Sequence, residues 1–137
     1  MPSESTSGAD DGTVPVKATG IHVRLMRDAV VSDSMKGAEA ESDSTMYTHR
    51  FYFQYGAYVP DEYLKDVKRP EDLSFAKCAK DRLIVGSPED CLDQLQKWKE
   101  AIQPDYVIIR FRQPGGPSHQ KTIDAIRRFG EQVIPKL

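Results

Sequence analysis

The order of strand-like and helix-like segments constrains this chain most, because the sequence holds only three strand candidates. Partly alternating, β-branched runs over residues 21–31, 83–85 and 106–112 predict strands, and a helical pattern follows each of them. Strands that alternate with crossover-length helices pair in parallel and form an α/β fold. Such a sheet is covered on both faces and needs neighbours on both edges. We therefore expect either strands borrowed from a partner or a portion of a larger sheet or barrel.

The helices are predicted from apolar spacing and from their start and stop residues. A helix over 35–55 is expected to end at Gly56, with an apolar face made of Ala38, Met46, His49 and Phe53. The charged segment 57–82 lies around Pro60 and Pro70, and short helices are expected there over 61–67 and 71–80.

The carboxyl-terminal third carries the clearest local signals. Ser87 is placed to cap a helix over 88–101, with Pro88 in its first turn and a buried face of Cys91, Leu95, Trp98 and Ile102. Ser118 is expected to cap the last helix, whose apolar stripe is Ile123, Ile126, Phe129 and Val133. The free N–H groups at the start of the helix over 88–101 also suit an anion or phosphate, although Glu89 and Asp90 already occupy that end.

Composition bounds the class of protein. The 137 residues predict one domain over 20–137 after a disordered lead-in at 1–19, which is polar and unlike a signal peptide. The net charge of −2 gives no general attraction to nucleic acid, and no apolar run reaches the roughly 20 residues of a membrane span. Cys78 and Cys91 form no disulfide framework, so a cytoplasmic setting is expected. No residue spacing indicates a metal site.

Two arginines at the end of the third strand are the best candidates for ligand contact. Arg110 and Arg112 share strand parity with Ile108, while Val107, Ile109 and Phe111 form the opposite, apolar face. Guanidinium groups at the carboxyl end of a strand suit a phosphate, sulfonate or carboxylate, or they pair with buried carboxylates. We expect Arg112, nearer the strand end, to contact a ligand and Arg110 to have the structural role.

Two neighbouring features leave alternatives open. The loop Gln113-Pro-Gly-Gly-Pro117 allows close backbone approach to a flat ligand, or is simply a strand-to-helix turn. The aromatic run from Tyr47 to Tyr55 suits the wall of a planar-cofactor pocket, the core or an oligomer face.

Three motifs, taken in order, resemble the carboxyl-terminal end of the luciferase-like flavin-dependent monooxygenases. They are Gly-Ser-Pro-Glu at 86–89, the strand that ends in Arg followed by a Pro-Gly loop at 106–117, and the terminal Phe-Gly-Glu-Gln-Val-Ile-Pro at 129–135. The resemblance is strongest over 81–137 and extends more weakly to residue 21.

The resemblance implies about three of the eight βα units of a (β/α)8 barrel of the TIM type. It also implies reduced FMN or the deazaflavin F420 as cofactor, and oxygenation of a small organic substrate, or hydride transfer where F420 is used. Arg110, Arg112 and Gln113 are then expected at the flavin or substrate opening, and no catalytic residue is assigned. The alternative is a non-catalytic, degenerate half-barrel that oligomerises or binds flavin. Either way we expect a homo-oligomer or a missing amino-terminal barrel portion.

Overall fold

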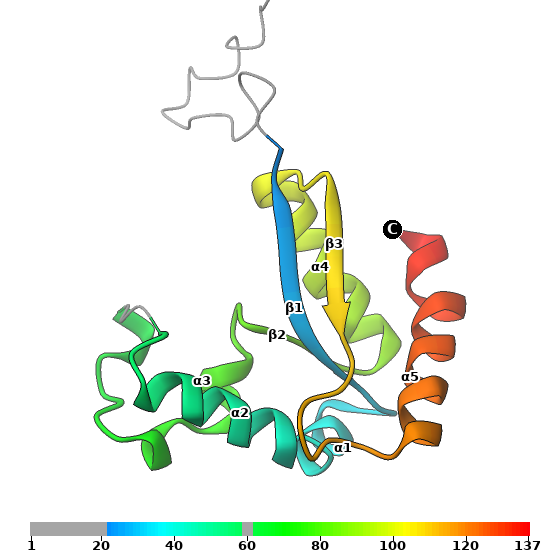
Figure 1. Cartoon of the computed structure of the whole chain (residues 1–137). Helices are drawn as coiled ribbons and strands as arrows, with labels where there is room; N and C mark the ends of the chain where they lie inside the picture. The colour runs from blue at the N-terminus through cyan, green and yellow to red at the C-terminus, as the bar shows by residue number, and fades with distance from the viewer. Residues whose placement is uncertain (1–21, 59–61) are drawn as a thin grey trace, which may run out of the picture.

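A computed structural model describes residues 22–58 and 62–137 of the chain. The expected disordered lead-in at 1–19 lies outside the described residues. The remaining chain forms a mixed α/β fold with a small parallel sheet and helices on both of its faces (Figure 1). The α/β class predicted from the alternation of segments is thus confirmed.

The sheet has three strands in the order β2-β1-β3, all parallel. They are β1 (Arg24–Val31), β2 (Leu83–Gly86) and β3 (Tyr106–Arg110). The longest strand, β1, lies in the centre. Its carboxyl-terminal half pairs with β2 from Asp28↔Leu83 to Val31↔Gly86, and its amino-terminal half pairs with β3 from Arg24↔Tyr106 to Asp28↔Arg110.

This strand order differs from that of three successive barrel units, in which β2 would lie between its sequence neighbours. The order follows from which edge of β1 each of the other two strands pairs with. The four residues of β2 cover only half of one edge of β1, and β3 pairs with the opposite edge. The crossovers then lie on opposite faces, as in an open, doubly wound sheet.

The first crossover, between β1 and β2, covers one face of the sheet near the carboxyl end of β1. It contains α1 (Met35–Ala40), α2 (Asp43–Gln54) and α3 (Phe75–Ala79), with 3₁₀ turns η2 (Glu62–Leu64) and η3 (Pro70–Asp72). Its buried core brings Ala38, Met46 and Cys78 against Leu83 and Val85.

Several predicted helix boundaries in this crossover are wrong. The single helix expected over 35–55 is interrupted at Glu41 and Ser42, where Ser42 Oγ donates to Glu39 O at 2.7 Å and a new helix begins. The helices expected over 61–67 and 71–80 are replaced by η2, η3 and the short α3, since Pro70 begins only a tight turn there.

The opposite face is covered by α4 (Pro88–Ile102) and α5 (His119–Gln132), and η4 (Ile134–Lys136) follows. Ser87 caps α4 as predicted: its Oγ accepts from Asp90 N at 3.1 Å, and Asp90 Oδ2 accepts from Ser87 N at 3.0 Å. Ser118 caps α5 through one bond, in which its Oγ accepts from Lys121 N at 3.2 Å. The helices pack on Ile84, with Cys91, Leu95, Phe129 and Val133 buried.

Two residues of the predicted α5 stripe, the half-buried Ile123 and the exposed Ile126, are not part of this core. Ile126 is 46% exposed, although Phe129 and Val133 of the same stripe are buried.

The amino-terminal halves of β1 and β3 extend beyond the first-crossover helices in Figure 1. Met26, Tyr106 and Ile108 are accordingly exposed there.

Candidate functional site

A buried carboxylate on β1 is the centre of the candidate site. Asp28 is 5% exposed and lies at the point where all three strands meet, opposite Leu83 on one side and Arg110 on the other. Strand alternation directs Asp28 toward α2, whereas its neighbour Ala29 packs in the α4–α5 core. A buried carboxylate is costly unless it is paired.

Arg110 supplies one partner. Its Nε donates to Asp28 Oδ1 at 2.6 Å and its Nη2 donates to Oδ2 at 3.1 Å, which is the bidentate geometry of a strong pair. Arg110 Nη2 also donates to Tyr52 Oη at 3.4 Å. Arg110 therefore has the buried carboxylate partner that the sequence analysis expected for it.

His49 of α2 supplies the second partner. Its Nε2 lies 2.7 Å from Asp28 Oδ2, and its Nδ1 is hydrogen-bonded to Tyr58 Oη. Tyr58 Oη in turn lies 3.5 Å from Cys78 Sγ. The result is a chain of four titratable groups, Asp28, His49, Tyr58 and Cys78, that runs from the sheet through α2 to α3.

Burial and pairing act against each other on these groups. Burial disfavours the charged form of Asp28, but hydrogen bonds from His49 and Arg110 outweigh it and lower the carboxyl pKa to about 2. Burial likewise disfavours the imidazolium, but interactions with Asp28 and Cys78 raise the pKa of His49 to about 9. Burial raises the pKa of Tyr58 as well. With its pKa raised to about 9, His49 is charged near neutral pH and donates from both ring nitrogens, so Tyr58 Oη accepts from Nδ1, while either Tyr58 or Cys78 can donate in the contact between them.

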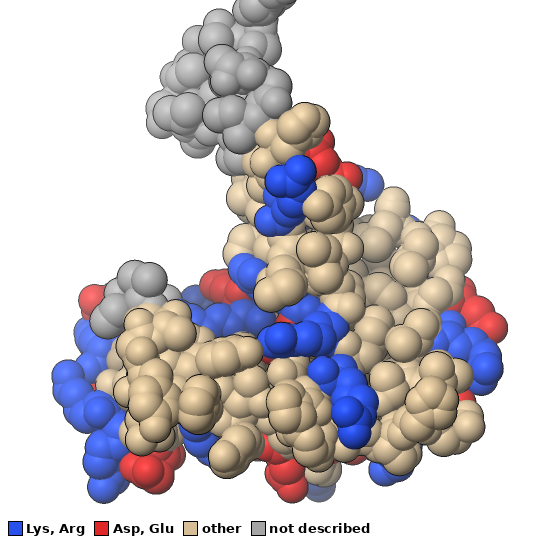
Figure 2. Space-filling view, viewed as in Figure 1, with Lys and Arg blue, Asp and Glu red and all other residues tan. Residues whose placement is uncertain are grey.

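An open pocket of about 620 Å³ lies over this cluster. Its size falls within the range of small-molecule sites. Figure 2 shows basic side chains gathered at the centre of this face, between the projecting strands and the helical lobe. The lining includes three of the four titratable groups together with Arg110, the ring of Tyr52, the apolar Met26, and three further charged residues: Asp28, His49, Tyr58, Arg110, Tyr52, Met26, Arg27, Asp81 and Arg82.

The charges of the lining add to a net positive pocket when His49 is protonated. Three arginines and one imidazolium face two carboxylates. The guanidinium of Arg82 lies over the Tyr58 ring, 5.2 Å from its centroid, and that of Arg27 lies over the ring of Trp98 at 4.3 Å. Trp98 does not line the pocket, but the rings of Tyr52 and Tyr58 do, so the pocket combines aromatic surface with positive charge, which suits a planar, anionic ligand.

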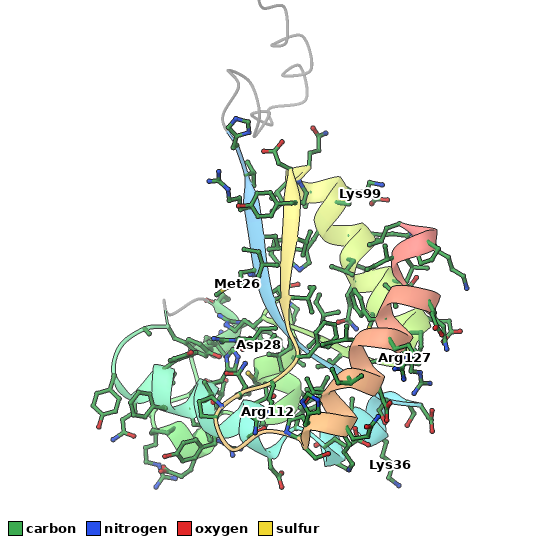
Figure 3. The ribbon with its side chains drawn as sticks, turned by 45° about the vertical axis from the view of Figure 1, so that its right-hand side comes forward. Met26, Asp28, Lys36, Lys99, Arg112 and Arg127 are labelled. Atoms are coloured by element: carbon green, nitrogen blue, oxygen red, sulfur yellow. The ribbon has the colours of Figure 1, made fainter. Side chains whose placement is uncertain are left out.

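The structure separates Arg112 from Arg110. The strand predicted over 106–112 ends at Arg110, so the expected parity does not extend to Arg112, which lies on the loop beyond β3 (Figure 3). Its Nε donates to Pro117 O at 2.9 Å, and the residue is exposed. Arg110 lines the pocket, whereas Arg112 holds the Pro-Gly loop closed.

Gln113, the third residue expected at the opening, is inside the molecule. It is 3% exposed, and neither polar atom of its side-chain amide has a hydrogen-bond partner within the described ranges. Its backbone carbonyl accepts from Gly116 N at 2.7 Å, which closes the tight turn of the loop. The three predicted site residues thus have three different environments.

A smaller cavity of about 330 Å³ lies at the carboxyl ends of β1 and β3, where the doubly wound order changes direction. It is mostly apolar, with Val31 and Phe111 in its wall and Ser118 and Lys121 from the start of α5. Open α/β sheets commonly bind ligands at this position. The larger pocket carries more of the charged and aromatic groups.

Sequence reasoning did not identify Asp28, His49 and Tyr58 as one site. The apolar spacing predicts His49 on the inner face of its helix, where it is indeed buried. Its partner, Asp28, is 21 residues away on a strand, and the spacing does not predict that contact. The signal that was available is the single carboxylate within the β-branched run of β1, because a charge at such a position needs a partner.

Comparison with known proteins finds no match for this chain. No protein-family model and no curated protein matches the sequence.

Two further kinds of feature are absent from the residues that the structure describes: a membrane-spanning helix and a metal-binding cluster. Within residues 22–58 and 62–137, no helix has the length and apolar character to span a membrane. The same residues contain no group of three or more His, Cys, Asp or Glu side chains arranged to hold a metal ion.

Proposed function

We propose that this chain is a flavin-dependent oxidoreductase, related to the carboxyl-terminal portion of the luciferase-like monooxygenases. The observation that carries the proposal is the pocket over Asp28, which combines a positive lining with the rings of Tyr52 and Tyr58. A flavin mononucleotide or F420 presents a planar ring system and a phosphate, and these two features match the two kinds of surface.

The residues of the pocket have three proposed roles: contact with the phosphate, contact with the ring system, and support of the pocket base. Arg82 and Arg27 line the pocket, and the guanidinium of Arg82 suits a phosphate or another anion. The guanidinium of Arg27 donates to Asp81 O and Met26 O and lies over the Trp98 ring, so Arg27 contributes positive potential. Tyr52, Tyr58 and Met26 offer the apolar and aromatic surface against which a ring packs. Arg110 and His49 are engaged by Asp28, so they fix the floor of the pocket and add positive potential to it.

The flavin, when bound, supplies the redox chemistry, either oxygen activation by reduced FMN or hydride transfer by F420. The contribution of the chain is to orient the cofactor, exclude water from it and hold protons nearby. His49 and Tyr58 hold two such protons, one on Nδ1 and one on Oη, at the base of the pocket. A small organic substrate is the expected second ligand.

The barrel is part of the same proposal. A complete (β/α)8 barrel would place β2 between β1 and β3, so the described order must change when the additional strands of a larger protein are present. The exposed Met26 and Ile108 lie on the sheet face that would line a barrel interior, which supports this context.

A titration of the full chain with FMN and with F420 tests the proposal. We expect saturable quenching of the cofactor fluorescence, weakened in Tyr52→Ala, whose ring lines the pocket. Tyr47→Ala, on the outer face of the same helix, is the matched control and should bind as the parent does. Unchanged fluorescence with both cofactors, or equal affinity in both variants, contradicts the proposal.

The alternative function is a non-catalytic protein that binds flavin. The complete pairing of Asp28 with His49 and Arg110 favours it, because satisfied groups stabilise the fold whether or not chemistry follows. Conversion of an oxidisable substrate distinguishes the two. An oxidoreductase forms oxygenated product from substrate with reduced FMN and oxygen, or transfers hydride between substrate and F420, and a binding protein does neither beyond the rate of the free cofactor.

A further inference from the structure

The outer face of α2 carries a row of exposed aromatic side chains. Tyr47, Phe51 and Tyr55 are 69%, 50% and 68% exposed, although they are large and partly apolar. They follow one another at intervals of four residues and so lie in line on one side of the helix. The rings of Phe51 and Tyr55 are in contact, with centroids 4.6 Å apart.

This aromatic row is on the side of α2 opposite its buried face. Thr45, Met46 and His49 point into the molecule. A surface helix ordinarily has one apolar face and one polar face, and a helix that is apolar on both sides is usually covered on both. The row is therefore a surface that a further protein element is expected to cover.

We propose that a second copy of this chain covers the row, through an antiparallel, two-fold pairing of α2 with α2 of the partner. In such an isologous contact a residue and its equivalent exchange the same interactions. The row has the required symmetry, since Phe51 lies at its centre and a tyrosine lies four residues away on each side. The two-fold axis then passes beside Phe51, and Tyr47 of each copy meets Tyr55 of the other.

The charges around the row suit self-association. Gln54, next to the row, is exposed and uncharged, Ser44 is half-buried, and the exposed Asp43 lies one turn before Tyr47 at the start of α2. Arg50 is the nearest basic residue on α2, and it is turned inward, where Nε and Nη2 donate to Leu73 O at 3.2 and 3.1 Å. An antiparallel pairing centred on Phe51 places the Asp43 carboxylates of the two copies at opposite ends of the contact, so like charges do not oppose each other, and it also places opposite ends of the helix dipoles together.

The amount of surface sets the expected strength of the dimer. Aromatic side chains of about 150–250 Å² each, half to two-thirds exposed, give on the order of 300–400 Å² per copy. The two copies together bury on the order of 600–800 Å², which is below the roughly 1,200 Å² of a stable specific interface, so the dimer should be weak and dissociate on dilution. The tyrosine hydroxyls keep the separated surface compatible with water.

Sedimentation of the full chain over concentrations from micromolar to near-millimolar tests the proposal. We expect a concentration-dependent monomer–dimer equilibrium, with dimerisation weakened by about tenfold or more in Phe51→Gln. Ile126→Gln, on the exposed side of α5, is the matched control and should dimerise as the parent does. A monomer at every concentration, as expected if a different protein covers the row, overturns the proposal, and so does a dimer that Phe51→Gln leaves intact.

A cross-link gives a second readout that does not depend on weakening the contact. Packed helix axes lie about 8–10 Å apart, which brings facing Cα atoms within the reach of a disulfide. Because Cys78 and Cys91 are buried, Phe51→Cys places an exposed thiol beside the axis. Under mild oxidation it should give a disulfide-linked dimer much faster than Ile126→Cys at equal concentration. Equal rates for the two variants, with both folded by circular dichroism, contradict the two-fold geometry.

Discussion

Arg110 at the end of β3 donates two hydrogen bonds to the carboxylate of Asp28 on β1, from Nε to Oδ1 at 2.6 Å and from Nη2 to Oδ2 at 3.1 Å. The two residues are 82 positions apart in the chain and adjacent across the sheet. Together with His49, this pair joins the central strand, an edge strand and the covering helix. The stability of the fold and the shape of the pocket therefore depend on the same three side chains.

Replacement of the carboxylate is expected to be severe. Asp28→Asn leaves His49 and Arg110 without their anion, and removal of one partner from a buried pair costs about 3–5 kcal/mol. Chemical denaturation should report a loss of this size. The control is Asp124→Asn, which breaks the exposed pair with Arg127 and should change the free energy of unfolding by less than about 1 kcal/mol. Equal losses in the two variants would contradict the account of the cluster.

The melting temperature should depend on pH in a way set by the same pair. The pKa of His49 is raised from 6.5 to about 9, so its stabilising contribution is complete below pH 6.5 and disappears as the pH rises through 9. The pKa of Asp28 is lowered from 3.8 to about 2, so its contribution is complete above pH 3.8 and disappears as the pH falls through 2. The cluster is therefore most stabilising between about pH 4 and pH 6.5.

Thermal melts from about pH 2 to above pH 9 check the prediction. The alkaline decrease that His49 causes should be absent in His49→Gln, whose side chain does not titrate. An unchanged alkaline decrease in His49→Gln would assign the effect to other groups.

Helix α4 should lose stability when its cap is removed. Ser87→Ala deletes the hydroxyl that accepts from Asp90 N, and such a cap is worth about 1 kcal/mol. Glu89→Ala, in the same turn, keeps the cap and is the control. Urea denaturation measures both. Any loss of flavin affinity in Ser87→Ala should follow the loss of stability, and weaker binding at unchanged stability would assign Ser87 to the ligand site.

Two glycines should respond in opposite directions to the same substitution. A Cβ at Gly116 would lie 2.6 Å from Gln113 O and 2.9 Å from Gln113 N, which are backbone atoms of the tight loop. Gly116→Ala should therefore destabilise the chain by more than about 1 kcal/mol. A Cβ at Gly130, within α5, would meet nothing within 4 Å, so Gly130→Ala should stabilise by about 0.5–1 kcal/mol. Thermal melts of both variants decide, and the opposite order would contradict the described loop.

Features that depend on a few neighbouring residues were predictable from the sequence. Ser87 and Pro88 start α4 as predicted because the cap, the fixed φ of proline and the acidic first turn are local properties. The opposite parity of Ile109 and Arg110 in β3 was also predictable, and it placed the arginine toward a carboxylate.

Features that depend on distant pairing were not. The order β2-β1-β3 follows from which edge of β1 each short strand covers, and no local pattern encodes that choice. The link between Asp28 and His49 joins two elements whose relative placement is set by the whole crossover. Ile126 fits the apolar period of α5 but is exposed because the described elements do not cover that part of the helix.

The most direct test of the central claim compares FMN with riboflavin, which has the same ring system without the phosphate. Calorimetric titration of the full chain should give a measurable affinity for FMN and an affinity about 10- to 150-fold weaker for riboflavin, because one charge-assisted contact is worth about 1.5–3 kcal/mol. Arg82→Gln should reduce that difference, and Arg127→Gln, on α5, should leave it unchanged. No heat of binding with FMN, or equal affinity for the two ligands in the parent chain, would contradict a flavin site built on this positive pocket.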